Sequence, residues 1–507
     1  MKKGKVYLVG AGPGDPGLFT LKGKKVLEEA DVIIYDYLAN VKLLNFCKEN
    51  VEKIYVGKKG GAHTLPQEKI NKLLVKKAKE GKTVVRLKGG DPFLFGRGGE
   101  EAEELQKEGI PFEIIPGITS AIAVPAYAGI PVTHRNFTST LAIITGHEAE
   151  GKEESKINFS ALSKIGTLVF LMGVKNLPYI IENLIKEGKS PETPVAVIQW
   201  GTLPKQKTVT GVLKNIVEKV KKTGVTAPAI IIVGEVVRLR EKFNWFETKL
   251  LFGKKVVVTR TREQASKLVE NLEALGAYCY EIPAIKIEPL LNENILEVIK
   301  KISNYKWIIF TSENGVKIFF KILWEAGKDW RAFGNTKIAV IGASTKKALE
   351  KLGIKPDLAP AKDFTQEGLI NEFAKLDIKN NLILIPRAKE ARELLPEKLK
   401  EMGAKVEVLP IYETKICEES KKELKKALEE GVDIITFTSS STVKNFFKLC
   451  EDLDKEKLKD LIFASIGPIT SSTLRDFGFE PHIEAKEYTI EGLVNAIAEY
   501  FKIRGTA

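Results

Sequence analysis

Three glycine-rich turns, each following an expected strand, are the segments of this sequence best suited to hold a small ligand. They lie at 10–17, 89–99 and 116–120. Glycine lets backbone amides approach a ligand closely, and the carboxylate of Asp91 can accept a hydrogen bond from a hydroxyl or an ammonium group. One such cluster alone is usually an ordinary turn. Three of them in one domain predict a ligand site.

The first turn also has the spacing of a dinucleotide-binding loop. Gly12, Gly14 and Gly17 form G-x-G-x-x-G, and Asp36 closes the next expected strand. Proline residues within the turn remove amide donors, however, and the helical pattern begins only near Thr20. The sequence therefore disfavours NAD. The two Gly-Lys-Ser/Thr runs lack the leading glycine of a P-loop.

The elements that must position these turns alternate between strand and helix over residues 5–250. Short apolar runs predict strands, and a helical period predicts a helix over 21–30. The predicted strands are 5–9, 32–35, 83–87, 112–115, 141–145, 167–171, 194–198 and 229–233. This pattern predicts an α/β fold. Residues 241–251, charged and aromatic, are expected to be a linker.

The rest of the chain contains an internal repeat. Four motifs recur in the same order at offsets of 127, 127, 125 and 124 residues. The pairs are 256–260 with 382–387, 309–312 with 436–439, 341–345 with 466–470, and 364–369 with 488–493. The repeat predicts two similar α/β lobes with hydroxyl-rich turns after their strands, and a ligand cleft between them.

Composition narrows the function further. The chain has 507 residues and a net charge of +13, of which the first 250 residues carry +11 and the remainder +2. The longest apolar runs are shorter than the ~18 residues of a membrane helix, so a cytoplasmic protein with no membrane partner is expected. Four cysteines and four histidines are scattered without metal-ligand spacing, so no metal is expected.

The three turns and several neighbouring motifs resemble the tetrapyrrole methylases, and within them the uroporphyrinogen-III C-methyltransferases. The resemblance covers about residues 5–237. The motifs that carry it are Gly10-Ala11-Gly12-Pro13-Gly14-Asp15-Pro16, Arg86-Leu87-Lys88-Gly89-Gly90-Asp91-Pro92-Phe93, Pro116-Gly117-Ile118-Thr119-Ser120, Thr64-Leu65-Pro66-Gln67, Phe95-Gly96-Arg97-Gly98-Gly99-Glu100-Glu101 and Met172-Gly173-Val174-Lys175-Asn176-Leu177.

The resemblance implies a two-subdomain methylase fold over residues 1–240, with S-adenosylmethionine bound between the subdomains. It makes Asp36 the proton acceptor and Lys58 the proton donor. It places the donor-binding positions at Pro13, Gly89, Gly90, Asp91, Leu94, Thr119, Ser120, Met172 and Gly201.

The implied reaction is consistent with these residue types. A pyrrole carbon of uroporphyrinogen III attacks the sulfonium methyl, and the ring must then lose a proton, which a carboxylate can accept. Two transfers give precorrin-2, on the route to siroheme or cobalamin. The methyl donor is already activated, so this chemistry needs no metal.

The second half resembles the uroporphyrinogen-III synthases over about residues 252–501, through the repeated motifs and Leu409-Pro410-Ile411-Tyr412-Glu413-Thr414. The resemblance implies a two-lobed α/β domain over 252–507. Lobe one would comprise 252–285 and 413–507, and lobe two would comprise 288–408. Residues 282–288 and 406–412 would connect the lobes.

A synthase of this family closes the linear hydroxymethylbilane while inverting ring D. Tyr412 matches the tyrosine that assists departure of the hydroxyl group. Backbone amides and hydroxyls would hold the acetate and propionate groups. The implied positions are Thr311, Ser312, Ser344, Thr345, Ser439, Ser440, Gly467 and Thr470.

Two alternatives stay open at this stage. The first is a methylase of another corrin precursor or of RNA, with a non-catalytic C-terminal binding domain. The second is a binding or sensor protein with a NAD-type loop. Because no basic–aromatic interleaving is visible, nucleic acid is not an expected partner. The expected partners are small tetrapyrroles, and the methylase resemblance implies a homodimer.

Overall fold

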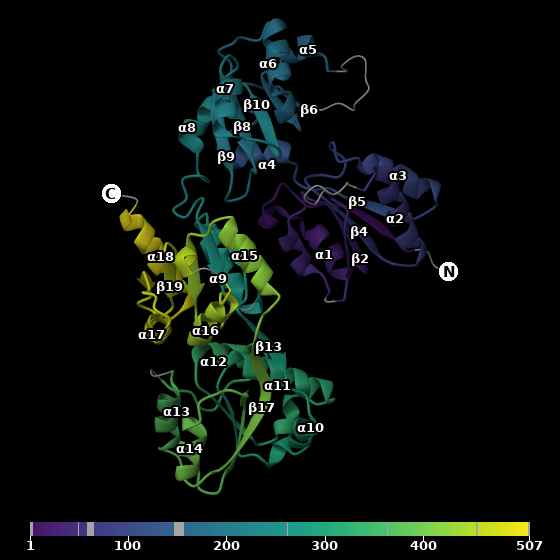
Figure 1. Cartoon of the computed structure of the whole chain (residues 1–507). Helices are drawn as coiled ribbons and strands as arrows, with labels where there is room; N and C mark the ends of the chain where they lie inside the picture. Colours follow the sequence, from purple (N-terminus) through teal and green to yellow (C-terminus); the bar gives the residue numbers. More distant parts are fainter. Residues whose placement is uncertain are drawn as a thin grey trace. The chain divides into compact units, whose positions relative to one another are not determined.

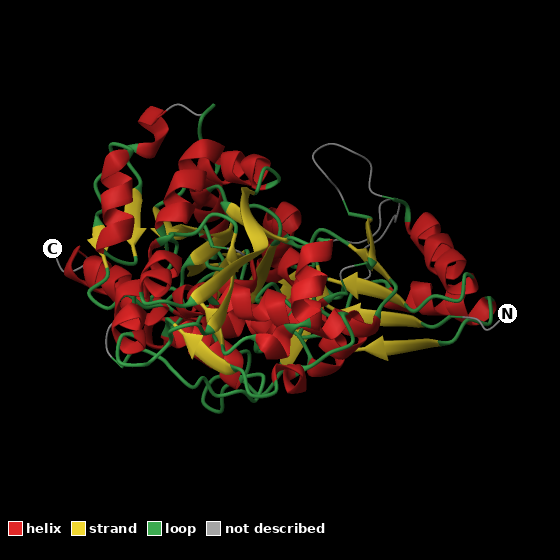
Figure 2. Ribbon diagram, turned by 90° about the horizontal axis from the view of Figure 1, so that it is seen from below, coloured by secondary structure: helices red, strands yellow, loops and turns green. Residues whose placement is uncertain are grey.

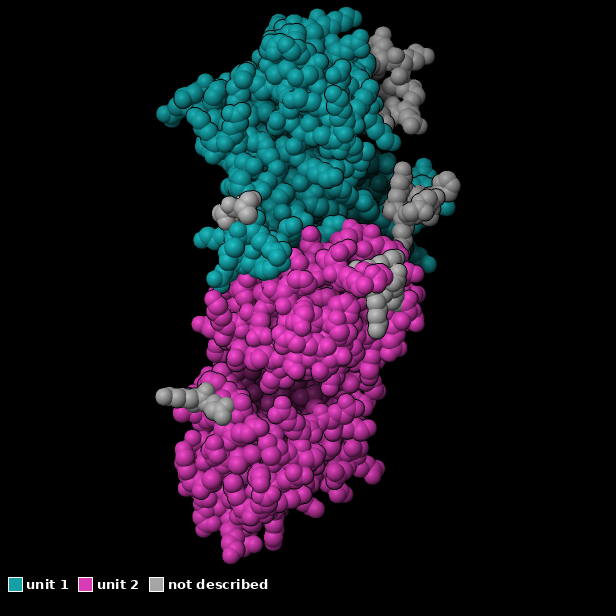
Figure 3. All heavy atoms as spheres, turned by 60° about the vertical axis from the view of Figure 1, so that its left-hand side comes forward, with its two compact units in different colours: residues 1–255, 270–279, 498–507 teal, residues 256–269, 280–497 magenta. Residues whose placement is uncertain are grey.

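The computed structural model describes residues 4–48, 50–57, 65–146, 157–260, 262–361, 364–452 and 455–504 (Figure 1). Helices and strands are interspersed along the chain (Figure 2), which confirms the expected α/β class. Contacts divide the chain into two units (Figure 3). Unit 1 comprises residues 1–255, 270–279 and 498–507, and unit 2 comprises 256–269 and 280–497.

The first sheet of unit 1 is entirely parallel, in the order β3-β2-β4-β1-β5. All its strands therefore end at one edge, where the loops that follow them meet. The central strand β4 packs Val84 into the core beneath α2 and α3, and Val85 into the core of the opposite face. The strands are β1 (Val6–Gly10), β2 (Val32–Tyr35), β3 (Glu52–Tyr55), β4 (Val84–Lys88) and β5 (Phe112–Ile115).

The second sheet of unit 1 is mixed, in the order β6-β7-β10-β8-β9. Only β6 and β7 run parallel. Helix α4 connects the sheets and packs Ala121 and Val124 against this second sheet. The strands are β6 (Leu141–Thr145), β7 (Thr167–Leu171), β8 (Pro194–Gln199), β9 (Lys207–Val212) and β10 (Ala229–Val233).

The helices of unit 1 cover these sheets. They are α1 (Leu21–Glu29), α2 (Gln67–Lys79), α3 (Gly98–Lys107), α4 (Ser120–Tyr127), α5 (Phe159–Ser163), α6 (Leu177–Lys186), α7 (Ile216–Thr223) and α8 (Arg240–Phe243). The expected linker 241–251 packs into this unit. Phe246 and Leu251 are buried, and Glu247 accepts hydrogen bonds from Gln206 and Thr208. Phe246 thus serves packing, which the high charge of the segment obscured in the sequence.

Two further sheets contain the repeat, and each forms the centre of one lobe. Lobe one has the order β12-β11-β18-β19-β20, and lobe two has the order β13-β17-β16-β14-β15. Their strands are β11 (Lys255–Val258), β12 (Tyr278–Glu281), β18 (Ile434–Phe437), β19 (Ile462–Ser465) and β20 (Ile483–Glu484), then β13 (Ile285–Pro289), β14 (Trp307–Phe310), β15 (Lys337–Val340), β16 (Leu382–Ala388) and β17 (Lys405–Ile416).

The repeat is visible in this strand order. β12-β11-β18-β19 of lobe one corresponds to β17-β16-β14-β15 of lobe two, and all of lobe two lies between β12 and β18 in the sequence. The helices after β10 are α9 (Arg262–Ala274), α10 (Glu293–Lys300), α11 (Glu313–Glu325), α12 (Ala343–Glu350), α13 (Gln366–Phe373), α14 (Leu394–Glu401), α15 (Ser420–Glu429), α16 (Ser440–Leu449), α17 (Pro468–Asp476) and α18 (Ile490–Arg504).

The connection between the lobes is an antiparallel pair. β13 pairs with residues 412–416 at the end of the long strand β17. The expected connecting segment 406–412 differs from this, because residues 405–410 pair with β16 inside lobe two. The connecting stretch is therefore the continuation of a core strand beyond its pairing with β16. The wider lobe boundaries expected from the sequence stay a prediction.

Candidate active sites

The carboxyl ends of β1, β4 and β5 touch backbone to backbone through three glycines. A Cβ atom on Gly117 would lie 2.3 Å from the carbonyl oxygen of Gly90, and one on Gly10 would lie 2.5 Å from the Gly117 backbone. Gly12 and Gly90 exchange two hydrogen bonds, of 3.2 and 2.7 Å. The three glycine-rich turns predicted from the sequence therefore form one continuous backbone surface.

This surface is open where a ligand would need it. Apart from Gly90 and its two chain neighbours, no described residue has an atom within 4 Å of the position that a Cβ would take on Gly90, whose φ is +68°. The carboxylate of Asp91 fixes the turn after β4. Its Oδ1 accepts hydrogen bonds from the amides of Phe93 and Leu94 at 2.8 and 3.0 Å. Its Oδ2 accepts from the Gly117 amide at 3.0 Å. The carboxylate thus ties the β4 turn to the β5 turn.

The second sheet contributes the loop after β8. The amide of Asp15 donates to Thr202 Oγ1 at 3.1 Å, and the hydroxyl of Tyr127 donates to Asp15 Oδ2 at 2.6 Å. Burial, and then this bond, raise the pKa of the Tyr127 hydroxyl. These contacts hold the first turn against α4 and the β8 loop, so both subdomains border the same site.

Strained backbone conformations are a second observation that points to these loops as a ligand site. Among the described residues, six non-glycine residues have a positive φ, and five of them lie in unit 1. They are Phe95, Arg97, Met172, Trp200 and Thr202. Met172 directly follows β7, and the last two flank Gly201, where a Cβ would lie 2.2 Å from Val124. Such conformations persist where the surroundings enforce them, and they gather at ligand sites.

The expected donor-binding positions are all described. Seven follow the first sheet's strands and two follow β7 and β8 of the second sheet. The first group is Pro13, Gly89, Gly90, Asp91, Leu94, Thr119 and Ser120, and the second is Met172 and Gly201. The structure brings their loops together. Their individual contacts with a donor stay a prediction.

Asp36, the expected proton acceptor, lies just past the end of β2. Its Oδ1 accepts from the Leu38 amide at 3.2 Å, and its Oδ2 forms an ion pair with Arg86 Nη2 at 3.1 Å. Its side chain is 27% exposed. Lys58, the expected proton donor, lies outside the described residues.

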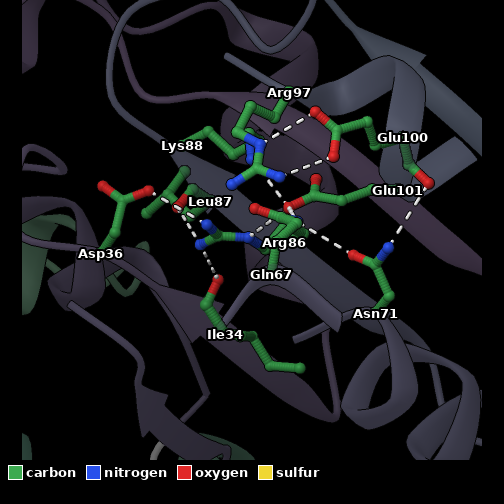
Figure 4. Close-up of polar contacts among 10 residues, drawn as sticks. All are labelled: Ile34, Asp36, Gln67, Asn71, Arg86, Leu87, Lys88, Arg97, Glu100 and Glu101. Atoms are coloured by element: carbon green, nitrogen blue, oxygen red, sulfur yellow. Dashed lines mark hydrogen bonds and ion pairs between the residues drawn. The ribbon is translucent and has the colours of Figure 1, made fainter. Parts of the chain in front are cut away.

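A cluster of buried charges lies behind Asp36 (Figure 4). The side chains of Arg86, Lys88 and Glu101 are 4%, 5% and 0% exposed. Glu101 Oε1 contacts Arg86 Nε at 3.2 Å and Lys88 Nζ at 2.7 Å. Burial, and then the charge of Arg86, lower the pKa of the Lys88 ammonium. The sequence interpretation assigned no role to these residues. Their signal was two cations at alternate positions of a strand whose other residues are apolar.

The synthase-like half has a different kind of site, built on helix N-termini. Ser312 caps α11: its Oγ accepts from the Gly315 amide at 3.0 Å and contacts the Tyr412 hydroxyl at 2.9 Å. Burial raises the pKa of the Tyr412 hydroxyl, and the contact with Ser312 opposes that rise. The structure thus joins two of the residues implied by the resemblance.

The repeat places a matching cap in lobe one. Ser439 caps α16, with its Oγ accepting from the Thr442 amide at 3.3 Å and Thr442 Oγ1 accepting from the Ser439 amide. Ser440 Oγ donates to the Ile469 carbonyl at 3.3 Å, which joins α16 to the start of α17. The N-terminal ends of equivalent helices therefore carry equivalent hydroxyls.

The remaining implied substrate positions differ in accessibility. Ser344 is exposed and Thr311 is half-buried, whereas Gly467 is buried. The side chains of Thr345 and Thr470 are buried inside α12 and α17, and the contacts of all these positions with a substrate stay a prediction. Figure 3 shows that the surface of unit 2 is hollowed near its middle.

Two negative findings concern the described residues alone. No group of three or more His, Cys, Asp or Glu side chains there is arranged to hold a metal ion. No helix formed by them is both long enough and apolar enough to cross a bilayer.

Comparison with known proteins assigns both halves. Residues 5–217 match the family model of the tetrapyrrole (corrin/porphyrin) methylases, and residues 266–495 match that of uroporphyrinogen-III synthase HemD. The porphyrin biosynthesis protein HemD of Ruminiclostridium josui is 41% identical over 502 residues, which cover 98% of each chain. The chain belongs to both families, as a fusion. It is a bifunctional enzyme of porphyrin biosynthesis, with a methylase half and a synthase half.

Other relatives match the methylase half. The uroporphyrinogen-III C-methyltransferase of Methanocaldococcus jannaschii is 57% identical over 237 residues, covering 46% of this chain and 98% of its own. The crystal structure of the Thermus thermophilus uroporphyrin-III C-methyltransferase complexed with S-adenosylhomocysteine is 41% identical. It covers 46% of this chain and all of its own, with a TM-score of 0.41.

Proposed function

We propose that the methylase half transfers two methyl groups from S-adenosylmethionine to uroporphyrinogen III and so forms precorrin-2. The observation that carries this proposal is the carboxylate of Asp36. It is partly exposed and lies at the carboxyl ends of the strands, where the glycine-lined turns also lie. A relative that is 57% identical over 239 residues is named an S-adenosyl-L-methionine-dependent uroporphyrinogen III methyltransferase, which supports the choice of donor.

The residues present suit this donor. The open backbone at Gly90 and the strained Met172 would bind it, and Thr119, which caps α4, would lie beside them. When bound, the donor supplies an electrophilic methyl group on a sulfonium sulfur. The chain's own contribution is to orient the pyrrole carbon and to accept a proton.

Asp36 is the proposed proton acceptor. One of its oxygens faces Arg86 and the other the Leu38 amide, and neither contact uses all of the lone pairs of the carboxylate. A carboxylate held in this way can take the proton that the methylated ring must lose. Lys58 completes the proposed pair as proton donor.

We also propose that the synthase half cyclises hydroxymethylbilane with inversion of ring D. Tyr412 would donate a proton to the departing hydroxyl group, with Ser312 holding the phenol in place at 2.9 Å. Burial raises the pKa of the Tyr412 hydroxyl, so the phenol is protonated at neutral pH. The product is the substrate of the methylase half.

The substrate's carboxylates would bind at helix N-termini. The capped ends of α11 and α16 and the starts of α12 and α17 present backbone amides and the positive end of the helix dipole. The proposed positions at or beside these ends are Thr311, Ser312, Ser344, Thr345, Ser439, Ser440, Gly467 and Thr470. Hydroxyls and backbone amides can bind the carboxylates of a flexible bilane in more than one conformation, because these contacts do not require ion pairs of fixed geometry.

The proposed partners are small acidic tetrapyrroles, and the proposed assembly is a homodimer through the methylase half. Uroporphyrinogen carries eight carboxylates, so the +11 charge of the first 250 residues favours its approach. Light scattering of the purified chain would test the dimer: a monomeric mass would refute it.

One experiment tests both activities. The purified chain, incubated with hydroxymethylbilane and S-adenosylmethionine, should form precorrin-2. Because the bilane closes without inversion when no synthase acts, accumulation of uroporphyrinogen I would refute the synthase proposal. Accumulation of unmethylated uroporphyrinogen III would refute the methylase proposal.

A further inference from the structure

The buried charges of Arg86, Lys88 and Glu101 adjoin Asp36, and Arg86 contacts its carboxylate directly. Arg86 and Lys88 point from alternate positions of the central strand β4 toward the face that packs α2 and α3. Burying two cations is unfavourable unless they are paired, and Glu101 on α3 pairs with both. With Asp36 included, the cluster contains two positive and two negative groups.

Arg86 is the centre of this cluster. Its Nη1 donates to the carbonyls of Ile34 and Leu87 at 3.3 and 3.2 Å, its Nε to Glu101 and its Nη2 to Asp36. The guanidinium is planar, so contacts at three nitrogens fix its orientation. Figure 4 shows Asp36 and Glu101 on opposite sides of it. The position of Nη2, and with it that of Asp36 Oδ2, is thereby determined.

The cluster has one accessible end. Arg86, Lys88 and Glu101 are at most 5% exposed, whereas Asp36 is 27% exposed. Glu101 Oε1 accepts from Arg86, Lys88 and Gln67, while its Oε2 has no hydrogen-bond partner among the described residues. The buried carboxylate of Glu101 therefore holds Arg86 and Lys88 in place, and Asp36 is the more exposed end of the cluster.

We propose that Arg86 is a positioning residue for methylation, which holds Asp36 in the orientation needed to accept the proton, and that Glu101 and Lys88 keep Arg86 in place. This inference rests on the proposed role of Asp36. It assigns a purpose to a costly arrangement that packing alone does not require, because apolar residues on the same face would fill the core without a desolvation penalty.

The test compares Arg86→Lys and Arg86→Gln with the wild-type chain. Arg86→Lys keeps the charge balance but cannot reach Glu101 and Asp36 together. Both variants should lower kcat for methylation at least about 10-fold, and Arg86→Lys should retain more activity than Arg86→Gln. The KM for S-adenosylmethionine and the affinity for S-adenosylhomocysteine should change less than about 2-fold. Lys5→Gln, which breaks the Lys5–Glu113 pair at the opposite end of the same sheet, is the matched control and should keep its wild-type kcat.

Folding and mechanism are separated by two further measurements. Thermal unfolding reports whether each variant folds, and if Arg86→Gln does not, Arg86→Lys carries the test. Arg86→Lys should also lower kcat less in an Asp36→Glu background than in the wild type, because the carboxylate is already displaced there. A wild-type kcat in folded Arg86→Lys, or equal effects in both backgrounds, would overturn the inference. Full activity of Asp36→Asn would instead refute the proposed role of Asp36 itself.

Discussion

The methylase half and the synthase half build their sites from different materials. In the methylase half, glycine backbones touch at the ends of three strands, and five non-glycine residues adopt a positive φ. In the described part of the synthase half, only Asn380 does so, and the site consists of capped helix N-termini repeated in two lobes. The first arrangement suits a ligand of fixed shape that backbone must approach closely. The second suits a flexible substrate with many carboxylates.

The difference also concerns charge. The methylase half encloses two cations and an anion behind one partly exposed carboxylate. The key pair of the synthase half, Ser312 and Tyr412, is neutral. A proton acceptor needs an ionised group, whereas a proton donor to a leaving hydroxyl needs a protonated, neutral one. Each half therefore has the electrostatics that its proposed chemistry requires.

The sharpest test of this contrast is Asp36→Asn. Loss of the acceptor should lower methylation by about 10²- to 10⁴-fold, while S-adenosylhomocysteine still binds and bilane cyclisation is unchanged. Calorimetry and separate assays of the two activities measure this. Precorrin-2 formation at the wild-type rate would remove Asp36 from the mechanism.

Tyr412→Phe should affect the opposite half alone. Cyclisation with inversion should slow by roughly 10²-fold, because the departing hydroxyl loses a proton donor, while methylation of supplied uroporphyrinogen III continues. The ratio of uroporphyrinogen III to uroporphyrinogen I measures the effect. An unchanged ratio would show that the phenol is only a packing group.

Replacing a glycine by alanine should destabilise the methylase half more than the synthase half. Gly117→Ala would place a Cβ 2.3 Å from a backbone oxygen and should cost at least about 1–3 kcal/mol, with loss of donor binding. Gly342→Ala, before α12, would meet its nearest atom at 4.0 Å and should change stability by less than about 0.5 kcal/mol. Chemical denaturation compares the two. Similar costs would contradict the backbone-contact account of the methylase site.

The smallest effect concerns the two equivalent caps. Ser312→Ala and Ser439→Ala should each cost about 1 kcal/mol of stability, because each helix loses a capping acceptor. Ser312→Ala should slow cyclisation more than Ser439→Ala, since of these two serines only Ser312 contacts Tyr412. Equal cyclisation rates in the two variants would indicate that the cap, not the tyrosine contact, matters.

Periodicity predicted the buried strands of unit 1 well but missed β3 and β9. Both lie at the edge of their sheets, and their sequences, Glu-Lys-Ile-Tyr and Lys-Thr-Val-Thr-Gly-Val, mix polar and apolar residues. The edge strands β5 and β6 were predicted all the same. In β3 and β9 no residue is buried, so polar residues interrupt the apolar run that reveals a strand.

The site was predictable where a motif required a residue type, and not where three-dimensional pairing decided its role. Glycine turns signalled close backbone approach from sequence alone. The pairing of Glu101 with Arg86 depends on α3 lying over β4, which local sequence does not specify. Likewise, the burial of Thr345 follows from which face α12 turns inward.

The insertion of lobe two within lobe one has a consequence for synthesis of the chain. β11 pairs with β18, Val256 opposite Ile434, so the first strand of lobe one emerges from the ribosome long before its neighbour exists. At about 5–20 residues per second the wait is on the order of 10 seconds or more. Lobe two is contiguous in sequence and can fold during that interval. Until then the apolar β11 segment can pair with β12 on one side only, and its other side is exposed to misassembly and to chaperone capture.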